Sequence, residues 1–415
     1  MNSSPLSIVL ITIGLGAVLA LLFAYVSTLR NLAQNDSARR RTAHGLPAHS
    51  PTDVKASAEA RSASDASWSP ISILKPLKGV EQGLEENLRA LFEQDYPIFE
   101  VLFAAEDNSD PALEVARRVS AEFPERPVRI LGGRAAAGLN PKVRLLQVLE
   151  QLASFDLVLV SDSNVRPGPH YLRALAWKQR QTGAALVHSL LGGSSGQSLG
   201  ARLEDMQLSG WIAASVSFTD RYGDPVVIGK SMLLERHALS EVGGFPKVSD
   251  ILAEDYILGR RLRQAGHTVA LCADPLQVIT SGRGIKDFFN RHVRWGQMQR
   301  TIHPLAFFVS LLAQPLPFLV VGAALAQGPW RCAALGILGF KWTAELFVAR
   351  RVAGRLSPWT AALLPLKEGL FVAVWCTALV KRTVHWRGNR MLVGSGSRLL
   401  RLEPGAHLRR VRISP

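Results

Sequence analysis

Between about residue 68 and residue 304, short apolar runs alternate with longer stretches in which apolar residues recur at helical spacing. The short runs are rich in Val, Leu, Ile and Phe, which is typical of buried strands. The expected strands lie at residues 71–74, 99–105, 128–131, 157–161 and 185–189, with an extended segment at 225–234. The expected helices lie at residues 81–92, 112–122, 142–152, 170–181, 199–218, 254–265 and 285–300. This alternation predicts βαβ units and an α/β fold with a mostly parallel, doubly wound sheet.

Glycine and serine interrupt this pattern at residues 192–196, where the sequence Gly-Gly-Ser-Ser-Gly predicts a mobile loop.

The N-terminal part of the chain is apolar and uncharged over residues 7–29. That length spans a hydrocarbon core of ~30 Å at a helical rise of 1.5 Å per residue. A cleaved signal peptide is the alternative, but no charged region precedes the run and the run is long. Because Arg30, Arg39, Arg40 and Arg41 follow it, the positive-inside rule places the N-terminus outside and the rest of the chain in the cytoplasm. We therefore expect a membrane anchor at residues 1–30.

Residues 31–67 are rich in Ala, Ser and Arg and hold almost no large apolar side chains. Such a segment cannot bury enough surface to offset the entropy lost on ordering. We expect a disordered linker that ends where the α/β domain, residues 68–304, begins.

After residue 304 the chain becomes apolar again, and residues 305–380 are expected to hold membrane segments. The candidate segments are residues 305–326, with Pro315 and Pro317 as expected kinks, residues 332–349 and residues 360–380. Lys341 and Glu345 in the second segment stand four residues apart, so they share a helix face and can pair.

The basic tail, residues 381–415, should stay in the cytoplasm. Three crossings after a cytoplasmic domain would place it outside, whereas two crossings and one re-entrant or interfacial segment keep it inside. We favour the second topology, with residues 360–380 as the segment that does not fully cross.

The chain carries a formal net charge of +15, which is compatible with nucleic acid or with an anionic membrane. Its basic residues stand largely beside apolar segments, so the membrane is favoured and no nucleic-acid partner is expected. The three cysteines are far apart and form neither a disulfide framework nor a zinc motif, which is typical of a reducing compartment.

Two acidic groups follow expected strands, where the carboxyl ends of parallel strands face a ligand crevice. Asp162 follows residues 157–161, and its carboxylate could bind Mg²⁺ or Mn²⁺. A motif with paired carboxylates would have a second Asp at position 164, where this chain has Asn164. Asp107 and Asp110 follow residues 99–105 and could bind a nucleoside. Helix capping or turn formation explains all three carboxylates equally simply.

Glu254-Asp255 opens an expected helix, where acidic residues are favoured by the helix dipole alone. The functional alternative makes Asp255 a general base for an acceptor hydroxyl.

Arg291, Arg294 and Trp295 share a face of the expected helix at residues 285–300. Two guanidinium groups can clamp phosphates, and Trp295 can form a flat wall for a sugar or a lipid. A basic helix next to the membrane with an interfacial Trp is the alternative.

Lys142 stands at a helix start, where the dipole disfavours a cation, so contact with a phosphate is plausible. Gly229-Lys230-Ser231 resembles the end of a P-loop, but Asp224 stands where that loop requires Gly. His188 ends an expected strand and fits a core histidine as well as a ligand.

The order of these groups resembles the D, D, D, (Q/R)xxRW series of inverting family 2-like glycosyltransferases. Several stretches are closer still to the ceramide glucosyltransferase family, which is glycosyltransferase family 21, and to the related hopanoid-biosynthesis glycosyltransferases. These stretches are Asp110-Pro111-Ala112, Asn140-Pro141-Lys142, Asp162-Ser163-x-Val165-Arg166, Val187-His188, Ala253-Glu254-Asp255-Tyr256 and Arg291-x-x-Arg294-Trp295.

The resemblance implies a GT-A fold, which is Rossmann-like, in a cytoplasmic domain with membrane helices at both ends. It also implies a UDP-sugar donor and Mg²⁺ or Mn²⁺. By this resemblance Asp107, Asp110, Lys142 and His188 bind the donor, and Asp162 binds the metal. Asp255 acts as the base, and the segment from Arg291 through Arg294 to Trp295 closes over the diphosphate and the acceptor.

The sequence therefore predicts a multi-pass enzyme of the cell membrane that moves a sugar, with glucose favoured, to a lipid hydroxyl, with ceramide favoured. A glycosyltransferase for hopanoids or other lipids is one alternative, and a processive sugar-polymer synthase is another. A non-catalytic scaffold that keeps the nucleotide-sugar fold is a third, which the complete acidic set disfavours.

Overall fold

The computed structural model describes residues 3–44, 68–194, 196–354, 356, 358–386 and 388–402. Within them, eight strands form one sheet in the order β3-β2-β1-β4-β7-β6-β8-β5. The strands are β1 (Ile71–Pro76), β2 (Phe99–Ala104), β3 (Val128–Leu131), β4 (Leu157–Ser161), β5 (Val165–Arg166), β6 (Leu186–Ser194), β7 (Ser231–Glu235) and β8 (Val269–Ile279). Strands β3, β2, β1 and β4 are parallel, and β7 runs antiparallel to both of its neighbours. The predicted α/β class with a mainly parallel sheet is confirmed.

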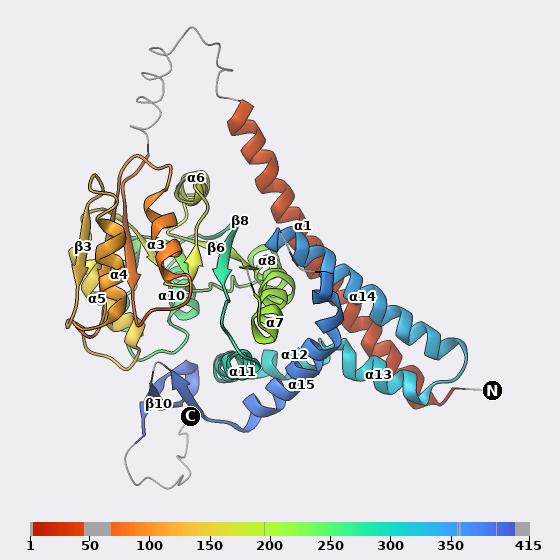
Figure 1. Ribbon diagram of the computed structural model, residues 1–415. Coiled ribbons are helices and arrows are strands. Elements are labelled where there is room, and N and C mark those ends of the chain that lie inside the picture. The colour runs from red at the N-terminus through yellow and green to blue at the C-terminus, as the bar shows by residue number, and fades with distance from the viewer. Residues whose placement is uncertain are drawn as a thin grey trace.

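Helices cover both faces of this sheet (Figure 1). Because both faces are buried, the strands read as continuous apolar runs rather than alternating ones. One face packs against α3 (Leu84–Phe92), α4 (Pro111–Ser120), α6 (Tyr171–Thr182) and α8 (Ala213–Tyr222). The other packs against α5 (Pro141–Leu152), α9 (Arg236–Glu241) and α10 (Glu254–Gln264).

The glycines at 192 and 193 belong to β6 and do not form the mobile loop that the sequence suggested. They are needed for close packing. A Cβ on Gly193 would overlap Asp205, and one on Gly192 would lie 2.9 Å from the Val352 carbonyl oxygen. The expectation is therefore wrong for residues 192–194, and residue 195 lies outside the described residues.

Strand β8 was not predicted, because Asp274 and Pro275 in its middle are residues that normally end a strand. It pairs with the end strand β5 and with β6. The extended segment expected at 225–234 is a strand only from Ser231 onward.

The apolar segments form helices that lie beside the α/β domain (Figure 1). They are α1 (Pro5–His44), α12 (Pro304–Leu312), α13 (Pro315–Leu325), α14 (Pro329–Ala353) and α15 (Leu364–Val380), with a 3₁₀ turn η3 (Pro358–Leu363) before the last. Among the described residues, four helical segments are long and apolar enough to cross a membrane: Pro5–Asn35, Pro304–Leu325, Pro329–Ala353 and Trp359–Val380. The second is interrupted before Pro315, as expected.

Helix α1 joins the membrane segments to the α/β domain. Its Ile11 and Val18 pack with α13 and α14, whereas Tyr25 and Leu32 join the core under the sheet. The expected linker boundary at residue 30 is therefore wrong, because α1 continues to His44. The Ala, Arg, Leu and Gln residues there favour helix, and Leu32 is anchored by burial. Residues 45–67 lie outside the described residues.

The basic tail forms a small antiparallel sheet that the sequence analysis missed: β9 (Thr383–Trp386), β10 (Asn389–Val393) and β11 (Leu399–Arg401). Its Val384, Met391 and Leu399 pack on Leu252 of the α/β domain. The chain therefore returns to the α/β domain after α15. Residues 403–415 lie outside the described residues.

Adjacent leucines on β11 test this anchoring. Leu399 is buried and Leu400 is 43% exposed. We expect Leu399→Ala to reduce the local unfolding free energy of residues 383–401 by about 2–5 kcal/mol, because it opens a cavity. Leu400→Ala should change it by less than about 1 kcal/mol. Amide hydrogen exchange of the detergent-solubilised protein measures both. Equal protection in the two variants would contradict the packing.

Candidate active site

The buried ammonium group of Lys142 lies at the centre of a polar cluster. Its Nζ is 3.0 Å from Asp162 Oδ1 and 3.2 Å from Glu254 Oε1, and it donates to the Gly229 carbonyl oxygen at 2.6 Å. Burial alone would lower the pKa of Lys142, but the carboxylates of Asp162, Glu254 and Asp255 outweigh it and raise that pKa. Lys142 therefore stays charged and compensates carboxylates that come from different elements.

Two carboxylates begin α10, but only one of them is accessible. Glu254 is buried and accepts from Asn140 Nδ2 at 3.2 Å, whereas Asp255 is partly exposed. Asp255 Oδ2 accepts from the Gly229 backbone N–H at 2.5 Å, and a Cβ on Gly229 would lie 2.8 Å from Asp255 Cβ. Burial raises the pKa of Asp255, with Lys142 opposing. A partly exposed carboxylate with a raised pKa is suited to accept a proton.

Asp162 lies beyond the end of β4, where the antiparallel β7 begins. Lys230 stands just before β7, and its Nζ lies 3.4 Å from Asp162 Oδ2 and donates to Asn164 Oδ1 at 2.6 Å. Burial lowers the pKa of Lys230 to about 7, with Asp162 opposing and the nearby Arg291 and Arg283 lowering it further. An anion bound beside it would favour its charged form.

A second buried cluster holds the guanidinium of Arg291. Glu204 on α7 (Leu199–Gln207) is fully buried, and its carboxylate lies 3.2 Å from Arg291 Nε, 3.1 Å from His292 Nε2 and 3.6 Å from Arg283 Nη1. Burial would raise the pKa of Glu204, but Arg291, His292 and Arg283 outweigh it and lower that pKa. Glu204 thus fixes the start of the predicted clamp on α11 (Ile285–Ile302).

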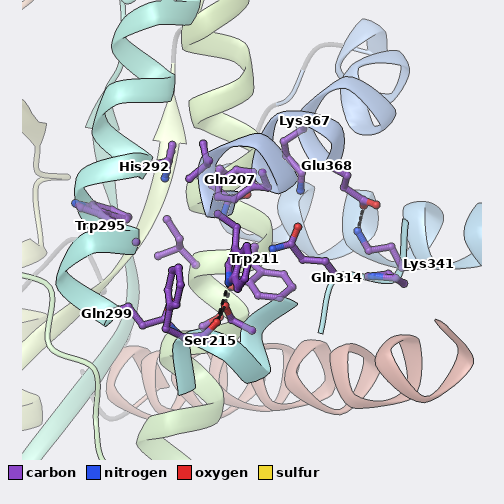
Figure 2. A pocket seen from close by; sticks show the side chains of 18 residues that line it. Gln207, Trp211, Ser215, His292, Trp295, Gln299, Gln314, Lys341, Lys367 and Glu368 are labelled. Carbon is purple, nitrogen blue, oxygen red and sulfur yellow. Dashed lines mark hydrogen bonds and ion pairs between the residues drawn. The ribbon is translucent and has the colours of Figure 1, made fainter. Parts of the chain in front are cut away.

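Helix α11 also lines a cavity of about 260 Å³ between it and the membrane helices (Figure 2). His292 and Trp295 lie at one end of it, and Lys341, Lys367 and Glu368 lie at the other. The Arg291 guanidinium lies over the Trp295 ring, 5.1 Å from its centroid. One helix therefore contacts both the basic cluster and the cavity.

The other predicted residues are placed outside the Lys142 cluster. Asp110 caps α4 by accepting from Ala112 N at 2.9 Å, and it also accepts from Gly79 N. Asp107 is exposed and accepts from Ser109 N and Oγ. Both follow β2, at the edge of the sheet where Asp162 follows β4.

His188 is fully buried in β6, and neither ring nitrogen has a hydrogen-bond partner in the part of the chain that the structure describes. Burial lowers its pKa to about 4, so the ring is neutral. Arg294 follows Arg291 by one turn of α11.

Sequence reasoning missed Lys230 and Glu204. In the sequence, Lys230 stood out only as part of a segment that resembles the end of a P-loop but lacks its first glycine. Glu204 and Asp205 form an acidic pair between Leu203 and Met206 in α7, and that signal could have marked Glu204 as a buried partner for a cation.

The Glu204 cluster can be tested by neutralisation. We expect Glu204→Gln to destabilise the protein by about 3–5 kcal/mol, because it leaves buried cations uncompensated. Asp224→Asn, which breaks the exposed pair with Arg263 at 2.9 Å, should cost less than about 1 kcal/mol. The unfolding midpoint in detergent compares the two. Similar midpoints would show that the Glu204 cluster contributes no more than a surface pair.

Comparison with known proteins identifies relatives along most of the chain. Ceramide glucosyltransferase 3 of Caenorhabditis elegans is 24% identical over 349 residues, which cover 81% of this chain and 75% of that protein. Ceramide glucosyltransferase 1 of the same organism is 25% identical over 355 residues, 79% of this chain and 72% of that protein.

Among solved structures, the mannosyltransferase PcManGT from Pyrobaculum calidifontis, in complex with GDP-Man and Mn²⁺, is 17% identical. The match covers 88% of this chain and 99% of that chain, with a TM-score of 0.48. The family model for glycosyl transferase family 21 matches residues 41–399. The expected family is thereby confirmed: the chain belongs to glycosyltransferase family 21.

Proposed function

We propose that the protein transfers a sugar, with glucose favoured, from a UDP-sugar to the hydroxyl of a membrane lipid of the ceramide type. The observation that carries this proposal is the cluster of Lys142, Asp162 and Asp255 on the same domain as a cavity formed with membrane helices. The names of the relatives, which are ceramide glucosyltransferases, support the donor and the acceptor class.

In the proposed reaction Asp255 removes the proton from the acceptor hydroxyl. The hydroxyl oxygen then attacks the anomeric carbon, the bond from that carbon to the diphosphate oxygen breaks, and UDP leaves with the electron pair. A single displacement of this kind inverts the anomeric configuration. The accessibility of Asp255, in contrast to the buried Glu254, supports its role as base.

The expected metal at Asp162 has an unfavourable environment. Both carboxylate oxygens already face ammonium groups, of Lys142 and Lys230, and the Asn164 amide oxygen also accepts from Lys230. Among the described residues, no group of three His, Cys, Asp or Glu side chains could hold a metal ion. These residues do not form a divalent-cation site by themselves.

We therefore assign charge neutralisation of the departing diphosphate to cations of the chain. Lys230 lies beside Asp162, and Arg283 and Arg291 are close enough to depress its pKa. Cations that are already oriented by buried carboxylates need little reorganisation as negative charge develops on the leaving group. The nucleoside is assigned to the edge of the sheet at Asp107 and Asp110, and His188 remains a proposed donor contact.

We further propose that the α/β domain lies on the cytoplasmic side of the cell membrane, as the arginines after the first apolar segment suggest. The return of β9–β11 to the domain supports one shared side for the domain and the tail.

The proposal is tested by transfer from radiolabelled UDP-sugars to ceramide, diacylglycerol and a hopanoid polyol, with the purified full-length protein in detergent. A single labelled glycolipid is expected. A product that lengthens with added donor would instead indicate a polymer synthase.

Two carboxylate substitutions test the assigned roles. We expect Asp255→Asn and Asp162→Asn to lower kcat by about 10²–10⁴-fold, because the first removes the base and the second disturbs the cluster that positions the leaving group. UDP binding should persist in Asp255→Asn. Asp156→Asn, at the opposite end of β4 and exposed, is the matched control and should keep full activity. Full activity in Asp255→Asn would remove Asp255 from the mechanism.

Chelation of metal ions tests whether lysine or a metal neutralises the charge of the departing diphosphate. Transfer is expected to continue in EDTA, and Lys230→Met should lower kcat by about 10²-fold, because a preorganised cation is lost. The exposed Lys247→Met is the control. Complete loss of transfer in EDTA, with recovery on adding Mg²⁺ or Mn²⁺, would assign the neutralisation to a metal instead.

A further inference from the structure

The cavity beside α11 has an unusual lining for a space among membrane helices. Aromatic and apolar side chains such as Phe371 and Trp375 form much of it, together with amide side chains such as Gln207 and Gln314. It is bounded by α11, α12, α15 and the π-helical turn η1 (Leu208–Ile212), which interrupts the helix that continues from α7 to α8. Such π turns are frequent at functional sites.

Three charged residues, Lys341, Lys367 and Glu368, line one end of this cavity, and together with Glu345 they neutralise one another. Lys341 pairs with Glu345 at 2.6 Å and with Glu368, and Lys367 pairs with Glu345. Trp342 Nε1 donates to Glu368 Oε1 at 3.0 Å. The sequence expectation that Lys341 and Glu345 pair is confirmed.

One carboxylate oxygen of this network has no hydrogen-bond donor. Glu368 Oε2 is buried and has no hydrogen-bond partner among the described residues. Glu368 as a whole is 8% exposed. The Gln314 Oε1 atom, between α12 and α13, is also buried and without a partner in the same part of the chain. Both residues line the cavity. A buried acceptor left unpaired costs about 1–3 kcal/mol, so these two acceptors indicate a ligand that supplies hydrogen-bond donors.

The same network excludes an anionic headgroup. Lys341 and Lys367 are the lysines of the cavity lining, and each is already paired with glutamate. His292 is paired with Glu204. A phosphate would therefore meet cations that are already neutralised and two unpaired acceptors that repel it. A neutral headgroup with O–H and N–H donors matches the lining.

The outer surface beside the cavity matches a lipid. On α12, which contributes Phe307 and Ser310 to the lining, Leu305, Phe308, Val309 and Leu312 are all more than half exposed. Apolar side chains exposed on a helix of this kind face acyl chains.

We infer that this cavity binds the headgroup of the acceptor lipid, and that Gln314 and Glu368 select acceptors whose headgroup carries an amide N–H or a second hydroxyl beside the reacting hydroxyl. An N-acyl sphingoid base has both groups, and diacylglycerol has neither. The inference rests on the proposed function for the identity of the reaction. Trp295 connects the two sites, because it lines the cavity and stacks with Arg291 of the basic cluster.

Two substitutions test the cavity in the full-length protein in detergent, with ceramide and diacylglycerol as acceptors. Gln314→Leu removes one unpaired acceptor. It should raise the KM for ceramide by about 3–10-fold, as expected for one hydrogen bond, and leave the KM for diacylglycerol unchanged. Ser310→Phe fills the space and should raise the KM for both lipids. Glu368 itself is a poor test, because its substitution also breaks the pair with Lys341.

Matched controls lie on α12 and α15, which both contribute to the cavity, at positions outside its lining. Leu312→Phe on α12 adds bulk at an exposed position, and Thr377→Val on α15 removes a hydroxyl that donates to the Ala373 carbonyl oxygen. Both should keep the acceptor KM of the unmodified protein. UDP binding, measured by calorimetry, should be the same in all four variants.

Binding of fluorescent ceramide without donor separates this inference from the proposed function. If the unmodified protein binds ceramide but transfers no sugar, and Ser310→Phe abolishes the binding, the cavity assignment stands and the proposed reaction fails. If transfer occurs and neither Gln314→Leu nor Ser310→Phe changes the acceptor KM, the proposed reaction stands and the cavity assignment is wrong.

Discussion

The charge of the buried Lys142 ammonium holds the site together. It brings the start of α5, the end of β4, the turn before β7 and the start of α10 to one point. Without it, Asp162, Glu254 and Asp255 would be negative charges close together in a poorly solvated place, where mutual repulsion is strong. With it, Glu254 stays buried as a counter-ion and Asp255 can remain accessible at the crevice.

Helix α11 contacts both the buried Glu204 cluster and the cavity. Arg291 is held by Glu204, which is buried and carries a charge that only its cationic neighbours make tolerable. His292 also contacts Glu204, and together with Trp295 it lines the cavity. Under the proposed function, this single helix would set the spacing between the bound diphosphate and the bound acceptor.

Local patterns were sufficient for those parts of the fold and site that depend on nearby residues. The apolar runs identified β1, β2 and β4, and the position of Asp162 after β4 followed from them. The Glu254-Asp255 pair at a helix start was also visible. The role of Lys230 was not visible, because Lys230 comes close to Asp162 only when β7 runs antiparallel beside β4. Strand β8 contains an Asp-Pro pair that local rules exclude, and pairing with β6 overrides those rules. The tail was misjudged because its charge hid alternating apolar residues such as Val384 and Met391, whose partner Leu252 lies far away in the sequence.

That tail sheet also bears on the order in which the protein is made. Ser397 accepts from Leu252 N through its carbonyl oxygen at 2.9 Å, and its Oγ accepts from Ala253 N at 2.8 Å, directly before Glu254. The ribosome completes this support only after α12, α13, α14 and α15 have been synthesised. A nascent chain whose α/β domain is complete but whose membrane helices are not would therefore lack the hydrogen bonds to Ser397 that hold the backbone just before Glu254 and Asp255.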